Sequence, residues 1–193
     1  LRRMYKTLLM LPWAMPAYIS ILLWRVGIFN TEFGVLNKLL TMLGLGKVDF
    51  LGSNAIAFCS CLALNLWMAL PFMISTIDGA LQSVDRNLYE SARLDGAGFW
   101  TCLRSITVPA IWPIVAPAAV MTTFITFKQF DIIYLLTQQR GYMTGASLNT
   151  VITYAHQNAF VSNNYGLSSA VSMLLFVVII AFSLMTNRSL REE

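Results

Sequence analysis

The sequence predicts an all-α protein that crosses a membrane several times. Of its 193 residues, 57% are hydrophobic and 11% are charged, whereas an ordinary soluble domain is roughly 45–50% apolar and about 25% charged. Four runs with few charges approach the roughly 20 apolar residues that a membrane-spanning helix needs. None shows the sustained alternation of polar and apolar residues that is typical of a membrane β-barrel. The predicted fold is therefore a polytopic helical bundle.

The four predicted spans lie near residues 7–24, 54–77, 111–136 and 167–186. The first contains Pro12 and Pro16, which remove backbone donors and are expected to kink the helix. Pro109 and Pro113 stand where the third span begins, and proline is tolerated in the first turn of a helix. We expect the chain 1–193 to form a single transmembrane domain.

The basic residues predict which loops face the cytoplasm, because Lys and Arg concentrate in short loops on that side. With the N-terminus inside, eight of them lie in inner segments and four in outer ones. The inner set is Arg2, Arg3, Lys6, Arg86, Arg93, Arg104, Arg188 and Arg191, and the outer set is Arg25, Lys38, Lys47 and Arg140. This scatter over both faces argues against nucleic-acid binding as the reason for the net charge of +4.

The segments between the spans have distinct patterns. Apolar residues from Phe33 to Leu43 recur at helical spacing, which predicts a short amphipathic outer helix or a packed outer loop. On the inner side, Ser83 is expected to cap a short helix, and Gly96 to turn the chain into a second one that ends near Ile106. The segment 137–165 is polar with one formal charge and reads as a substantial outer loop.

The most specific motif lies in the inner loop 83–109. Glu90, Ala92 and Gly96 are followed, after nine further residues, by Ile106-Thr107-Val108-Pro109. This pattern resembles the EAA loop of binding-protein-dependent ABC importers, with Ser91 in place of the first alanine and Val108 in place of leucine. The resemblance implies a type I importer permease fold, in which this loop grips a separate ATPase.

The resemblance assigns the loop its functional residues. Leu88, Tyr89, Ala92, Leu94 and Gly96 would form the surface that docks on the ATPase, and Glu90, Arg93 and Asp95 would supply charge pairs at its rim. The sequence contains no G-x-x-x-x-G-K-[ST] phosphate loop. ATP and Mg²⁺ would therefore be used by two partner ATPase subunits, and no cofactor is expected on this chain.

Several further stretches resemble sugar-importer permeases of the maltose type. These are Leu11 to Pro16, Phe29-Asn30, Gly34 to Asn37, Leu135 to Thr137 and Ala159-Phe160. The resemblance implies a sugar pocket midway across the membrane, lined by Met68, Ala69, Phe72, Thr126 and Gln129. It also implies a second permease subunit, an extracytoplasmic sugar-binding protein, a bacterial or archaeal inner membrane, and one or two additional N-terminal helices.

Other candidate residues carry weaker signals. Lys128 and Asp131 are spaced i and i+3 within the third predicted span, and we interpret them as a mutual ion pair, with direct substrate contact as the alternative. His156 is interpreted as an outer-loop residue, with contact to a binding protein or to substrate as the alternative. Cys59, Cys61 and Cys102 lack metal-site spacing and are expected to be free thiols. We expect no metal site.

The function predicted is that of a permease subunit that imports a sugar by alternating access driven by ATP. Two alternatives remain: an importer of the same architecture for a non-sugar solute, and a multi-span scaffold that transports nothing. A membrane-embedded enzyme is disfavoured because one His and sparse acids form no catalytic grouping. The segment Gln138 to Gly141 departs from the Thr-x-Gly-Gly-Pro turn of sugar permeases, which leaves the shape of the outer loop open.

Overall fold

The computed structural model describes residues 2–137 and 148–189, and all secondary structure within them is helical. The predicted Gln138 to Gly141 turn lies outside the described residues. The elements are α1 (Arg2–Ala14), α2 (Ala17–Leu23), the π-helical η1 (Trp24–Ile28), α3 (Val35–Met42), α4 (Asn54–Gln82), α5 (Arg86–Leu94), α6 (Phe99–Cys102), the π-helical η2 (Leu103–Thr107), α7 (Val108–Phe127), α8 (Asp131–Thr137), α9 (Val151–Phe160) and α10 (Tyr165–Ser189).

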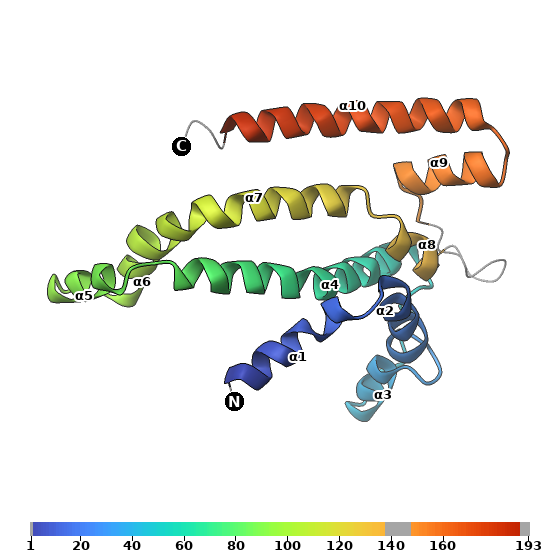
Figure 1. Cartoon of the computed structure of the whole chain (residues 1–193). Helices are drawn as coiled ribbons and strands as arrows, with labels where there is room; N and C mark the ends of the chain where they lie inside the picture. Colours follow the sequence, from blue (N-terminus) through green and yellow to red (C-terminus); the bar gives the residue numbers. More distant parts are fainter. Residues whose placement is uncertain (1, 138–147, 190–193) are drawn as a thin grey trace.

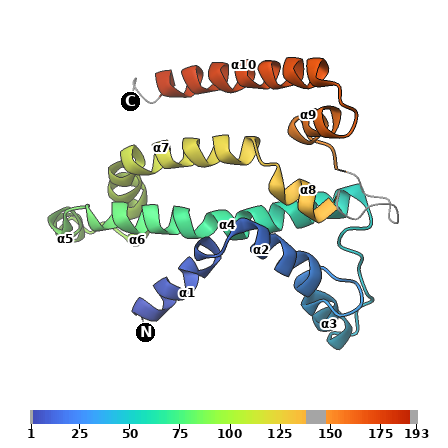
Figure 2. The same ribbon diagram turned by 45° about the vertical axis from the view of Figure 1, so that its right-hand side comes forward.

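Three long helices, α4, α7 and α10, set the long direction of the molecule (Figure 1). The short helices α5 and α6 lie at one end of them, and α2, α3, α8 and α9 gather at the other (Figures 1 and 2). The start of α1 and the end of α10 lie toward the α5 end. The segments predicted to be cytoplasmic therefore share one end, in agreement with the predicted topology.

Helices of membrane-spanning length or a bent pair of helices occur in the regions of all four predicted spans, and the number of spans stays a prediction. Three helical stretches are long and apolar enough to cross a membrane, namely 54–82, 99–137 and 165–186, and the bent pair 4–14 and 17–28 could form a fourth. Only 6% of the apolar window in each of the last two stretches is buried. Apolar helices with so little burial suit a lipid or protein environment rather than water.

Two predicted spans are not straight. The expected kink at Pro12 and Pro16 is a bend of 98° between the two helices of the first pair. The third predicted span, 111–136, breaks after Phe127, where Lys128 closes α7, and the chain restarts as α8 at Asp131. That helix also begins earlier than predicted, because the turns α6 and η2 lead into α7 without an interruption at Pro109.

A compact hydrophobic core lies at the end of the molecule opposite α5. Ile21 of α2, Leu64 of α4, and Ile132 and Leu136 of α8 are at most 2% exposed and pack in one cluster. Arg25 strengthens this junction, since its guanidinium donates a hydrogen bond to the carbonyl oxygen of Leu135 at 3.0 Å. Burial of Ile132 and Leu136 turns α8 away from the line of α7 and so accounts for the break at Lys128.

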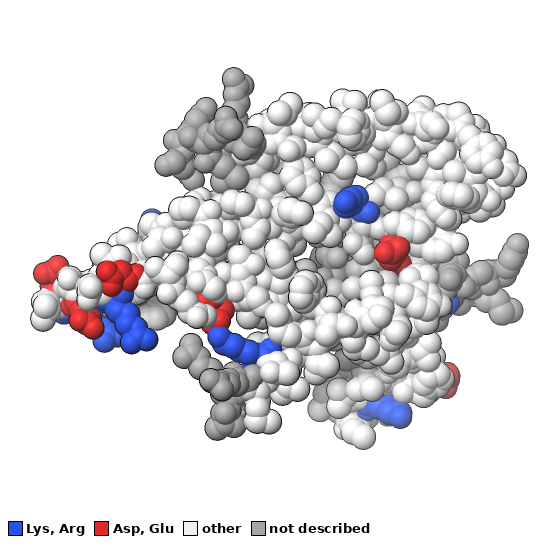
Figure 3. Space-filling view, viewed as in Figure 1, with Lys and Arg blue, Asp and Glu red and all other residues white. Residues whose placement is uncertain are grey.

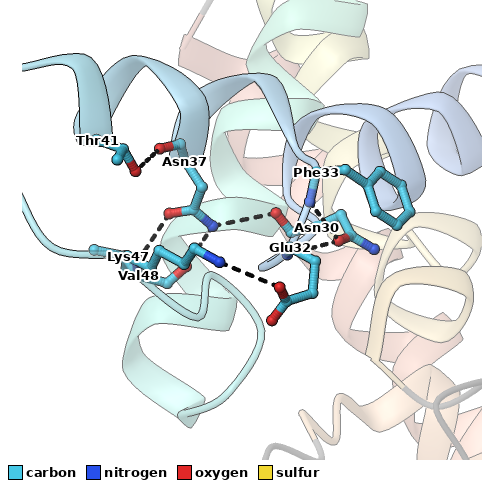
Figure 4. A network of polar contacts seen from close by, with 7 residues as sticks. All are labelled: Asn30, Glu32, Phe33, Asn37, Thr41, Lys47 and Val48. Atoms are coloured by element: carbon cyan, nitrogen blue, oxygen red, sulfur yellow. Dashed lines mark hydrogen bonds and ion pairs between the residues drawn. The ribbon is translucent and has the colours of Figure 1, made fainter.

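The predicted helix between the first two spans is α3, and Gly44 ends it with a φ of +76°. Its most buried residue is polar: Asn37 is 1% exposed. The Asn37 amide donates to the carbonyls of Asn30 (3.1 Å) and Val48 (2.9 Å) and accepts from the Val48 amide (2.8 Å), which ties the two loops that flank α3 (Figure 4). Leu39 and Met42 are exposed, so the apolar face of α3 points outward.

Replacement of Asn37 by alanine should destabilise this end of the protein. The change leaves the Val48 N–H and two carbonyls without their partner, and each unsatisfied buried group costs about 1–3 kcal/mol. We expect a lower midpoint temperature in a detergent thermal-shift assay of the purified protein. Lys38→Ala, on the exposed side of the same helix, is the matched control. Equal midpoints for the two variants would contradict a structural role for Asn37.

Candidate functional site

A cavity of about 590 Å³ lies between α1, α4 and the α7–α8 segment. All five residues that the sequence predicted for a sugar pocket line it: Met68, Ala69, Phe72, Thr126 and Gln129. They come together because the first three share one face of α4, while Thr126 and Gln129 stand where α7 ends. The structure thus places the predicted residues around one space, and their role in binding stays a prediction.

The cavity has additional lining residues that the sequence did not single out. They are Trp13, Asn65, Pro117, Ala118, Met121, Thr122, Ile125 and Ile132. Asn65 precedes Met68 and Ala69 by three and four residues, so helical spacing places it on the same face. Asn65 could therefore have been predicted, because it is an uncharged amide at this spacing within an apolar span. No local signal indicated Trp13, because it reaches the cavity from a distant part of the chain.

The polar side chains of the cavity differ in whether they already have partners. Thr122 donates to the carbonyl oxygen of Ala118 at 2.9 Å. Within the described part of the chain, the side chains of Asn65, Thr126 and Gln129 make no hydrogen bond. Two amides and one hydroxyl are therefore free to bind a ligand in an otherwise apolar wall, which is the usual composition of a small-molecule site.

The predicted ion pair between Lys128 and Asp131 is wrong. Within residues 2–137 and 148–189, neither Lys128 nor Asp131 takes part in an ion pair, and both residues are exposed. The prediction assumed one continuous helix with a spacing of i and i+3. The helix instead ends at Lys128 and a new one begins at Asp131, so the i and i+3 geometry of a continuous helix does not apply to this pair.

His156 belongs to α9, a short helix within the predicted outer segment, where the residue is half-buried. It lies among the rings of Phe130, Tyr134 and Phe160, with centroids 4.7, 5.1 and 4.8 Å away. The three cysteines are free thiols, as predicted. Among the described residues, no group of three or more His, Cys, Asp or Glu side chains could hold a metal ion.

The inner loop forms the predicted short helix α5 and the turn at Gly96, but the helical turns after Gly96 continue into α7, and Ser83 does not cap α5. Ser83 instead closes α4, and its hydroxyl donates to the carbonyl of Ala80 at 2.7 Å. Asp85 is the cap of α5, since its carboxylate accepts a hydrogen bond from the Asn87 amide at 2.9 Å. Serine and aspartate are both common at the N-cap of a helix. Asp85 takes this role here because α4 extends to Gln82, which leaves Ser83 at the end of α4.

The end of α5 is closed by a Schellman motif. Gly96 has a φ of +78°, its amide donates to the carbonyl of Arg93 at 3.0 Å, and the amide of Ala97 donates to that of Ala92 at 2.9 Å. This arrangement satisfies the last carbonyls of the helix, and glycine adopts the required positive φ without strain. Gly96 therefore fixes the direction in which the chain leaves α5.

Most residues predicted for docking are accessible. Leu88, Glu90, Arg93, Leu94, Asp95 and Gly96 are exposed, whereas Tyr89 and Ala92 are half-buried. The Tyr89 hydroxyl lies 2.9 Å from that of Thr107, so it holds α5 against η2. Among the described residues, Glu90, Arg93 and Asp95 make no ion pair within the chain. Their charges are available to a partner.

Figure 3 shows that charged side chains gather over the α5 end, while the middle of the same face is largely uncharged. A charged end beside an apolar middle is the pattern expected where a membrane protein enters the aqueous phase. Residues 1–191 match the family model described as the binding-protein-dependent transport system inner membrane component. The chain belongs to this family. Membership confirms the predicted recognition and favours a transporter permease over a scaffold.

The relatives of this chain include permeases named for sugar transport. The chain is 33% identical over 183 residues to the trehalose/maltose transport system permease protein MalF of Thermococcus litoralis, covering 95% of this chain and 60% of that protein. It is 30% identical over 199 residues to the galactooligosaccharides transport system permease protein GanP of Bacillus subtilis, covering 100% and 47%. The chain thus spans about half to three fifths of the length of these relatives.

A solved structure supports the predicted importer fold. The chain superposes with a TM-score of 0.86 and 28% identity on a chain of a bacterial ABC transporter involved in the import of the acidic polysaccharide alginate, covering 99% of this chain and 66% of that one. A second structure of a bacterial alginate ABC transporter, in complex with an alginate pentasaccharide-bound periplasmic protein, gives a TM-score of 0.87 and 28% identity. The all-α permease fold is therefore confirmed.

Proposed function

We propose that this chain is part of the transmembrane subunit of an ABC importer that carries a neutral saccharide across a bacterial or archaeal inner membrane. The observation that carries the proposal is the cavity between α1, α4 and α7, where the free side chains of Asn65, Thr126 and Gln129 meet aromatic and apolar walls. Hydroxyl groups of a sugar can pair with the amides, and its C–H faces can contact the apolar residues.

The charge of the lining favours a neutral substrate. None of the described residues that line the cavity is Asp, Glu, Lys, Arg or His. A carboxylated or phosphorylated substrate would lose its hydration there without gaining a counter-ion, which is costly in an apolar surrounding. The substrate proposed therefore differs in charge from the acidic polysaccharide named for the transporter of similar structure.

The partners proposed are a second permease, two ATPase subunits and an extracytoplasmic sugar-binding protein. Support for the binding protein comes from the family description and from the complex of the alginate transporter with its periplasmic protein. ATP binding would close the ATPase pair and move the docked helix α5, and the spans would then expose the cavity to the opposite side. A partner biases such states only through different affinities for them.

The test is ATP hydrolysis by the full-length permease with its partner subunits in lipid nanodiscs. Binding protein would be added with maltose, trehalose or galactobiose, and separately with an alginate oligosaccharide or with amino acids. We expect that at least one neutral sugar raises the hydrolysis rate several-fold and that the charged solutes do not. Stimulation by a charged solute alone would overturn the neutral-saccharide assignment while retaining the importer.

A further inference from the structure

Helix α5 is tied to the helix that follows it by a single side-chain hydrogen bond. The Tyr89 hydroxyl lies 2.9 Å from that of Thr107, which stands 18 residues further along the chain. Among the described residues, no other side chain of α5 makes a hydrogen bond or an ion pair with another helix. The neighbouring residues Leu88 and Glu90 are exposed, whereas Tyr89 is half-buried. This contact therefore fixes how α5 lies against η2.

The direction of this hydrogen bond follows from a second one. Thr107 is 9% exposed, and its hydroxyl donates to the carbonyl oxygen of Cys102 at 3.3 Å. Because a hydroxyl has one hydrogen to donate, the oxygen of Thr107 accepts from Tyr89. The phenol is the donor, and the three groups form a chain from the Tyr89 side chain to the backbone of η2.

Thr107 stands where a movement of α5 would reach the cavity. It is the last residue of η2, and α7 begins at the next residue. Single π-helical turns inside longer helices are frequent at functional sites. From η2, α7 continues to Phe127 and supplies Met121 and Thr126 to the cavity lining. A displacement of Thr107 therefore acts on the helix that forms one wall of the cavity.

The backbone makes a looser connection between α5 and α7. It passes through Gly96-Ala97-Gly98 before α6 begins. Glycine has more conformational freedom than any other residue, so this link sets the direction of the chain but resists bending poorly. Cβ atoms added at Gly96 and Gly98 would meet no atom within 4 Å, so no packing braces the two glycines. The hydroxyl pair is the stiffer of the two connections.

We propose that Tyr89 and Thr107 are positioning residues that pass the movement of a docked α5 to α7 and so keep ATP hydrolysis in step with sugar movement. The inference rests on the proposed function and adds to it the contact that links the docking loop to the cavity. Without this hydrogen bond, α5 still presents its exposed residues to the ATPase, but α7 no longer follows it. Hydrolysis then continues while fewer sugar molecules cross the membrane.

The test measures the ATP hydrolysed per sugar molecule imported. The full-length complex would be placed in proteoliposomes with binding protein and maltose, trehalose or galactobiose. Thr107→Val removes the hydroxyl and keeps the branched shape, whereas Thr107→Ser keeps a hydroxyl. Tyr89→Phe removes the donor alone, and the double variant completes a cycle that isolates the pairwise effect. Thr123→Val is the control, because Thr123 is exposed on α7 and its hydroxyl donates to the carbonyl of Ala119 in the same helix.

We expect Thr107→Val to raise this ratio roughly three- to tenfold, the range that the loss of one partly buried hydrogen bond implies. The ATPase should still co-purify with this variant. Tyr89→Phe should raise the ratio as much as Thr107→Val does, and the double variant should raise it no further. Thr107→Ser and Thr123→Val should match wild type.

An unchanged ratio in Thr107→Val would overturn the inference. Increases that add up in the double variant would also overturn it, because the two hydroxyls would then act separately. Loss of co-purified ATPase in Thr107→Val would assign the pair to the fold of the loop instead of to transmission. If no sugar stimulates hydrolysis by wild type, the proposed function itself fails, whereas a stimulated wild type with an unchanged ratio in Thr107→Val leaves that function standing.

Discussion

Proline at position 96 should abolish retention of the ATPase by the purified permease. Gly96 has a φ of +78°, whereas the proline ring holds φ near −65°. The substitution also removes the amide that donates to the Arg93 carbonyl in the closing motif of α5. The end of α5 would unravel, and α6 would leave it in another direction. Since proline can neither adopt this positive φ nor donate the hydrogen bond, we expect at least a roughly tenfold loss of co-purified ATPase.

Two variants of the same loop make this test specific. Gly96→Ala keeps the amide donor and places its Cβ in open space, but it retains the strain of positive φ, so we expect an intermediate loss. Gly98→Ala is the control, because Gly98 has a φ of −76° and no atom within 4 Å of an added Cβ. Full retention of the ATPase by Gly96→Pro, with the permease still folded, would contradict docking through α5.

The sequence predicted those features that depend on local signals. Hydropathy located the spans, and glycine at position 96 predicted the turn, because the requirement for positive φ is a property of one residue. The cap of α5 was harder, since Ser83 and Asp85 both suit an N-cap. The choice depends on where α4 ends, which its packing determines.

Features that depend on tertiary packing were not predicted from the sequence. No glycine or proline marks the break between Lys128 and Asp131, and the burial of Ile132 and Leu136 against Ile21 and Leu64 decides it. The misplaced ion pair followed from this one missed break. In the cavity, the residues of α4 and α7 were predictable by resemblance and helical spacing. Trp13 was not, because only the bend of the first helix pair brings it there.

Tryptophan at position 69 should block transport without disturbing the docking loop. Ala69 lies half-buried in the middle of the cavity lining on α4, and an indole there would occupy the space between α4 and α7. Displacement of a substrate by as little as about 1 Å can reduce a rate about a hundredfold, so we expect at least that loss of sugar uptake into proteoliposomes. ATPase retention should stay at the wild-type level, because α5 begins beyond the far end of α4.

Ala63→Trp supplies the matched control for this variant. Ala63 is exposed, lies six residues away on the same helix, and therefore faces another direction, outside the described cavities. Normal uptake with Ala63→Trp and none with Ala69→Trp would locate the pathway on one face of α4. Equal uptake by both would contradict a substrate path through the cavity.

Gly96→Pro should show the opposite pattern to Ala69→Trp, with sugar binding kept and ATPase lost, since the cavity and the loop lie at different places along the chain. Loss of both properties in each variant would mean instead that the two sites are not separable, and that α4 transmits every local change along its length.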